Sequence, residues 1–177
     1  MSKKSFEKFV NQQIASSDKP INRDAELAEW QSNLELLYQI IESFLQEFIS
    51  QGRIKRRYQS MQIHEDLLGE YTVRSMEIEI GSTSVRLEPI GTYLIGVKGR
   101  VDMIGSRGTA RLVLVDKDST GPKIIVKVNP SSERAVRSPP VRAPEWTWKI
   151  VTNGTRIRYQ ELTADSFYSS LMDVSRG

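Results

Sequence analysis

The sequence predicts an α+β fold in which one long amphipathic helix packs on an antiparallel sheet of about six or seven strands, with short helices at both ends. An apolar stripe with helical spacing runs through residues 27–48, and after Gly52 the composition changes to β-type residues with period-two alternation. Most alternating segments are joined by short connections, which require antiparallel neighbours. We therefore expect a single domain over residues 21–177, preceded by an arm or short helix over residues 1–20.

The long helix is predicted over residues 22–51. Asn22 is a suitable N-cap, and Gly52 stands where the apolar pattern stops. The stripe has alternating spacings of three and four residues, which is typical of a heptad seam. It either packs on the sheet or forms an interface with a partner, and core packing is favoured because flanking apolar residues widen it. The candidate interface residues are Trp30, Leu34, Leu37, Ile41, Phe44 and Phe48.

The sheet is predicted over about residues 70–160, with candidate strands that include residues 124–128. A two-residue turn between Gly105 and Gly108 would place Asp102 opposite Arg111, and Asn153-Gly154 is a strong hairpin signal. Residues 129–144 are expected to form a long loop rich in proline and arginine, which is typical of a functional or a disordered segment. Thr163 is expected to cap a last helix over about residues 163–174.

The composition excludes several classes of function. The chain of 177 residues has no cysteine, which removes disulfides, thiolate metal sites and cysteine nucleophiles. The single histidine, His64, lies beside two acidic residues and could be a general base, but a surface histidine is the favoured interpretation. We predict no catalytic residue, no cofactor and no metal site. The N-terminus lacks an apolar leader and no apolar run could span a bilayer, so a cytoplasmic protein is expected.

One hairpin resembles a known catalytic motif. Residues 99–105 followed by residues 112–117 are similar to the hairpin of the restriction-endonuclease-like nucleases, where an Asp ends one strand and a Glu-x-Lys ends the next. The resemblance implies that Asp102 would hold a divalent metal and that Lys117 would orient the attacking water. Val115 stands where the second carboxylate belongs, so a surface ion pair between Asp102 and Arg111 is the favoured interpretation.

Basic residues gather in segments 53–57 and 123–158, although the net charge of the chain is only +3. Such segments could neutralise phosphates, and Trp146 and Trp148, which share a face, could stack on bases or simply pack in the core. The candidate nucleic-acid contacts are Arg53, Lys55, Arg56, Arg57, Arg134, Arg137 and Arg142. The predicted function is a non-catalytic binding protein that acts through a protein partner or self-association. A nucleic-acid-binding accessory protein is the alternative, and a divergent metal-dependent nuclease around Asp102 and Lys117 is the third hypothesis.

Overall fold

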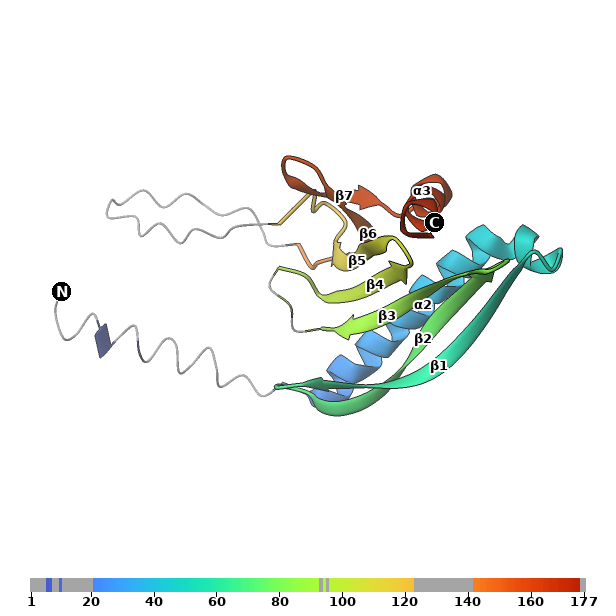
Figure 1. Ribbon diagram of the computed structural model, residues 1–177. Coiled ribbons are helices and arrows are strands. Elements are labelled where there is room, and N and C mark those ends of the chain that lie inside the picture. Colours follow the sequence, from blue (N-terminus) through green and yellow to red (C-terminus); the bar gives the residue numbers. More distant parts are fainter. Residues whose placement is uncertain are drawn as a thin grey trace.

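The computed structural model describes residues 6, 7, 10, 21–92, 94, 96–122 and 142–175. A seven-stranded antiparallel sheet, in which each strand pairs with the next in sequence, is combined with a long helix and a short C-terminal helix (Figure 1). The elements are α2 (Arg23–Ser50), β1 (Ile54–Glu65), β2 (Gly69–Ile80), β3 (Thr83–Gly91), β4 (Gly99–Gly105), β5 (Gly108–Asp116), β6 (Trp146–Asn153), β7 (Ile157–Glu161) and α3 (Ala164–Ser175). The predicted α+β class is confirmed.

The structure differs from the prediction at the start of the sheet. The sheet begins at Ile54, well before residue 70, with a strand, β1, that was not predicted. The expected strand at residues 124–128 and most of the loop at residues 129–144 lie outside the described residues. In the expected N-terminal arm, only Phe6, Glu7 and Val10 are described, and they are helical.

Helix α2 begins and ends where the sequence predicts. The Asn22 side chain accepts a hydrogen bond from the Ala25 N–H at 3.2 Å. Gly52 follows the helix with a φ of 70°, a left-handed conformation that glycine adopts without steric cost. Core packing, the favoured interpretation of the stripe, is what the structure shows for Trp30, Leu34, Leu37 and Ile41, which are all buried in the core. They lie in one cluster with Val101, Leu112 and Leu114 of the sheet.

The C-terminal end of the stripe contacts α3. Phe44 and Phe48 are only partly buried, and the Phe44 ring packs on Phe167 with 5.9 Å between ring centroids. Helix α3 is capped as expected, since the Ser166 N–H donates to Thr163 Oγ1 at 3.2 Å. Its buried face consists of Ser166, Phe167, Leu171 and Val174. The two helices therefore cover the core jointly at this end.

The β1–β2 hairpin changes its buried face halfway along. Close to the rest of the sheet, β2 buries Met76 and Ile78, whereas farther out it buries Tyr71 and Val73, which have the opposite parity. The register between β1 and β2 is unbroken across this change. Pairing of β2 with β3 stops at Met76, so the outer half of the hairpin leaves the seven-stranded sheet where the buried face switches.

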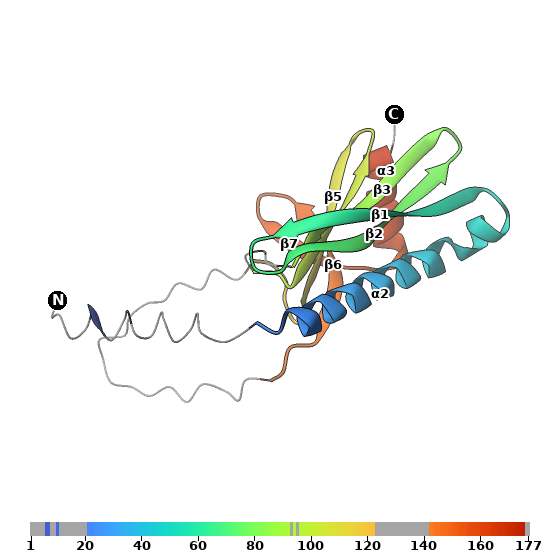
Figure 2. The same cartoon turned by 90° about the horizontal axis from the view of Figure 1, so that it is seen from below.

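Side chains of α2 cover the edge of β2 that β3 leaves free. Arg23 Nε donates to the Leu68 carbonyl at 2.7 Å, and Gln31 Nε2 donates to the Thr72 carbonyl at 3.3 Å. Farther along, the Tyr38 hydroxyl donates to the Arg74 carbonyl. Alternate carbonyls of an antiparallel strand point away from its partner and need other donors. Helix α2 supplies them and lies along the hairpin (Figure 2).

Candidate functional site

A pocket of about 670 Å³ opens at the end of the sheet where α2 begins. We call it the end pocket. Its walls come from the first turn of α2, the β1–β2 turn, the β3–β4 loop, the end of β5 with its following loop, and the start of β6. Five large apolar side chains line it: Leu67, Leu94, Val97, Val115 and Trp146. A pocket of this size and lining suits an apolar group of a ligand or partner.

Two of these side chains remain exposed at the pocket. Leu67 is 57% exposed in the β1–β2 turn, and Trp146 is 37% exposed at the start of β6. Trp148 lies on the same face of β6 but is buried, and its indole N–H donates to the Asn33 carbonyl at 2.9 Å. The two tryptophans therefore have different environments, and only Trp146 is available to a binding partner.

Lys98 is the positive group of the end pocket. Its Nζ lies 2.9 Å from Glu26 and 3.1 Å from Glu29, both on α2, and 5.8 Å from the Trp146 ring centroid. Burial disfavours the charged form of Lys98, but the two carboxylates outweigh burial and raise its pKa. The ammonium is therefore charged at neutral pH, which makes it unsuited to act as a base or nucleophile.

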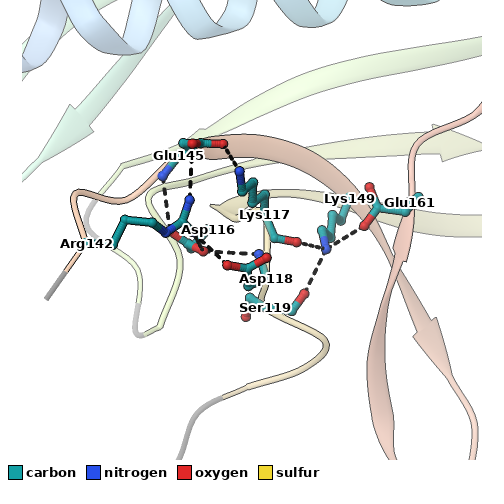
Figure 3. A network of polar contacts seen from close by, with 8 residues as sticks. All are labelled: Asp116, Lys117, Asp118, Ser119, Arg142, Glu145, Lys149 and Glu161. Carbon is teal, nitrogen blue, oxygen red and sulfur yellow. Dashed lines mark hydrogen bonds and ion pairs between the residues drawn. The ribbon is translucent and has the colours of Figure 1, made fainter. Parts of the chain in front are cut away.

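An ion-pair network joins the end of β5 to the start of β6 (Figure 3). Asp116 accepts hydrogen bonds from the Glu145 N–H and from Arg142, each at 3.1 Å. Arg142 also pairs with Asp118 at 2.7 Å and with Glu145 at 3.2 Å. The ion pair with Lys117 lowers the pKa of Glu145. Residues 116–118 and 142–145 are thus held side by side at the rim of the pocket.

Lys149 holds the loop that follows β5 in place. Its side chain is only 3% exposed, and its Nζ donates to the carbonyls of Lys117 at 2.6 Å and Ser119 at 3.0 Å. A third partner is Glu161 Oε1 at 2.6 Å. An ammonium group has three protons, so this buried charge is fully satisfied. Lys149 thereby holds the wall of the pocket that contains Ser119.

Glu65 anchors the β1–β2 turn against the β3–β4 loop. Its carboxylate accepts hydrogen bonds from the Thr92 N–H at 3.1 Å, from the Thr92 hydroxyl at 3.3 Å and from the Tyr71 hydroxyl. A Cβ atom at Gly91 would lie 2.9 Å from Glu65 Cδ, and Gly91 has a φ of 149°, a backbone conformation that favours glycine. The contact brings Leu67 to the pocket beside Thr92.

Two of the four basic residues that follow α2 are paired with carboxylates. Arg56 pairs with Glu42 at 2.5 Å, and Arg57 pairs with Glu79. Among the described residues, Lys55 has no ion-pair partner.

The other candidate nucleic-acid contacts are dispersed. Arg53 stacks over the Phe48 ring at 5.4 Å, and Arg142 is bound by the carboxylates of the pocket rim. Arg134 and Arg137 lie outside the described residues. Three of the predicted contacts, Lys55, Arg56 and Arg57, line one pocket of about 560 Å³ together with Glu79, whereas Arg142 lies apart from them at the rim of the end pocket.

The Asp102 hairpin has the expected register but a different ion pair. Asp102 lies opposite Arg111, as the two-residue turn predicts. Its partner is nevertheless Arg100, which contacts both carboxylate oxygens at 2.6 and 2.7 Å, because residues two apart on a strand share a face. Lys117 lies six residues beyond Arg111, about 20 Å along the strand at ~3.3 Å per residue. Asp102 and Lys117 are therefore too far apart to act on one metal ion.

The described residues also contain no group of three or more His, Cys, Asp or Glu side chains that could hold a metal ion. His64 is exposed on β1 and lies outside the lining of the end pocket.

Sequence analysis singled out Trp146 as a possible stacking residue but missed Leu67 and Lys98. Leu67 has a signal in retrospect: Leu67-Leu68 is an apolar pair in a polar turn, and only Leu68 is buried. Lys98 has none, since an isolated lysine in a loop is unremarkable. No described helix has the length and apolar character needed to cross a membrane. The sequence matches no family model, and neither the curated proteins nor the solved structures compared with it give a significant match.

Proposed function

We propose that the protein is a non-catalytic cytoplasmic binding protein that docks a protein partner, or a second copy of itself, at the end pocket. The observation that carries the proposal is an open pocket lined by five large apolar side chains, with Leu67 and Trp146 left exposed. Covering apolar surface contributes about 25 cal/mol per Å², so these two side chains would be natural anchors of an interface.

The charged groups of the pocket also suit binding better than proton transfer. Lys98, Asp116 and Arg142 are each engaged in ion pairs, and a general acid or base needs a proton that it can exchange near neutral pH. Paired charges at the rim of an apolar pocket instead give orientation and specificity to an interface.

Co-purification with substituted full-length chains tests this function. Tagged wild type, Trp146→Ala and Leu67→Asp would be compared by quantitative mass spectrometry, each with and without nuclease treatment. Leu36→Asp is the matched control, because Leu36 is 48% exposed on α2 and is not part of the pocket. We expect a set of nuclease-resistant partners that the control retains and both pocket variants lose.

Two results would overturn the proposal. Partners that both pocket variants retain as well as wild type would show that another surface mediates binding. Partners that disappear on nuclease treatment would favour the nucleic-acid alternative. Self-association is measured separately by light scattering, where Trp146→Ala should dissociate an oligomer if the second copy occupies the pocket.

A further inference from the structure

The rim of the end pocket carries more negative than positive charge. Among the described residues, two carboxylates line the pocket, Glu26 and Asp116. Four more belong to residues that are ion-paired with the rim or adjacent in sequence to the lining: Glu29, Asp118, Glu145, and Asp66, which precedes Leu67. In the described part of the chain these six carboxylates face three cations, Lys98, Lys117 and Arg142, which gives three minus six, a net charge of −3 for this part of the rim. The neighbouring pairs Arg23–Asp24 and Lys149–Glu161 leave this balance unchanged. The whole chain has a net charge of +3, so the acidic rim is a local feature.

The two most exposed carboxylates that Arg142 binds, Asp118 and Glu145, retain capacity to accept hydrogen bonds. Arg142 is shared among Asp116, Asp118 and Glu145, and Lys98 is shared between two glutamates. A carboxylate offers about four acceptor positions, more than Arg142 and Lys117 fill at Asp118 and Glu145. The side chains of Asp118 and Glu145 are 71% and 59% exposed, so their remaining acceptors face solvent.

We propose that the end pocket receives a large apolar side chain from a lysine- or arginine-rich segment of a protein partner. This assignment rests on the proposed function and specifies the chemistry of the partner. The apolar side chain would lie between Leu67, Val97 and Trp146, while flanking cations would pair with Asp118 and Asp66 at the rim. An acidic segment or a phosphate backbone would meet repulsion from the same carboxylates.

Selection from a random peptide library on the full-length protein tests the predicted chemistry. Peptides that also bind the Trp146→Ala variant would be removed by counter-selection, and the melting temperature of this variant checks its fold. If Trp146→Ala fails to fold, Leu67→Ser is used instead. We expect enriched peptides with one large apolar residue flanked by Lys or Arg. Enrichment of acidic peptides, or equal binding to wild type and the pocket variant, would overturn the proposal.

Charge substitutions test the rim directly with an enriched peptide. Asp66→Asn with Asp118→Asn should weaken binding roughly 2- to 30-fold, as expected for losing two solvent-exposed ion pairs. Raising the ionic strength should weaken wild-type binding in the same way. Asp165→Asn with Asp173→Asn on α3 is the matched control and should bind as wild type does. A rim variant that binds as tightly as the control would overturn the proposal.

The remaining outcomes separate this inference from the proposed function. If the co-purified partners require Trp146 but the selected peptides are acidic, the charge assignment fails while the proposed function stands. If the enriched motif matches residues 3–14 of this chain, where Phe6 and Phe9 lie among lysines, the occupant is the chain's own segment and the assignment to a partner is overturned.

Discussion

Gly99 lies against the face of the Trp30 indole. A Cβ atom at Gly99 would overlap Cζ3 of Trp30 and lie 3.0 Å from Cε3. Trp30 in turn packs on Trp148 with 6.2 Å between ring centroids. The absence of a side chain at Gly99 therefore lets β4 approach α2 closely, which brings the preceding residue, Lys98, within reach of the glutamates on that helix.

Gly99→Ala should destabilise the protein by about 1–3 kcal/mol, because the added methyl group overpacks a buried contact. Urea unfolding measures the change. Gly108→Ala is the matched control, since no heavy atom lies within 4 Å of a Cβ built there, and we expect it to be nearly neutral. Equal stability of the two variants would contradict the close contact.

Ile41→Ala should cost about 2–5 kcal/mol, because it removes a fully buried side chain from the contact between α2 and the sheet. Leu36→Ala, on the exposed side of the same helix, should change stability by no more than about 0.5 kcal/mol. Thermal and chemical unfolding give both values. An Ile41 variant that melts like wild type but dissociates an oligomer would place the stripe in an interface instead.

Lys149→Met should cost about 1–3 kcal/mol, because it leaves the carbonyls of Lys117 and Ser119 without their buried donor. Lys117→Met removes only an exposed ion pair and should have little effect. Amide hydrogen exchange of residues 117–121 provides a second measurement, and we expect faster exchange only in the Lys149 variant. Unchanged exchange would show that the loop is held by other contacts.

Stability should fall as the pH rises above about 10. Burial raises the pKa values of Tyr38, Tyr58 and Tyr71 in the folded protein. Hydrogen bonds to Glu42 and Glu65 raise the pKa values of Tyr58 and Tyr71 further. In the unfolded chain these phenols ionise near pH 10, so stability is fully present below that pH and is lost above it. Urea midpoints between about pH 8 and pH 11 measure the loss. Tyr71→Phe should make the decline shallower, and an identical slope in this variant would contradict the assignment.

No nuclease activity should depend on Asp102. The side chain is engaged with Arg100, and Lys117 lies about 20 Å farther along the neighbouring strand. Hydrolysis of labelled DNA and RNA with magnesium or manganese, by wild type and Asp102→Asn, is the test. Metal-dependent cleavage by wild type that disappears in a folded Asp102→Asn variant would contradict this expectation.

The sequence predicts the elements that have a regular pattern. Asn22 and Gly52 mark the ends of α2, and the turn between Gly105 and Gly108 correctly sets the register of β4 and β5. Strand β1 escaped prediction because its buried residues change parity between Ile54 and Ile63, which removes the period-two alternation. The parity change occurs where the hairpin leaves the sheet, and tertiary packing, not the local sequence, determines that position.

The end pocket could not be predicted for a related reason. It is assembled from α2, three turns or loops and the ends of two strands, and no local pattern encodes their meeting. Trp146 has the same alternation as Trp148, yet one is exposed at the pocket and the other is buried under α2. Position along the strand, relative to the helix that covers it, decides between them.

The outer half of the β1–β2 hairpin is attached to the rest of the molecule largely through α2, and this attachment affects how the protein opens. Between Gly69 and Ser75, β2 pairs with β1 alone. Apolar packing, the Glu65 contacts, the Arg74–Glu35 ion pair and hydrogen bonds from Arg23, Gln31 and Tyr38 hold this part of the hairpin to the rest of the molecule. Segments with few backbone partners open at a lower free-energy cost than the rest of a domain. We therefore expect the hairpin tip to unfold locally at a lower free-energy cost than the rest of the sheet, and this opening would remove one wall of the end pocket.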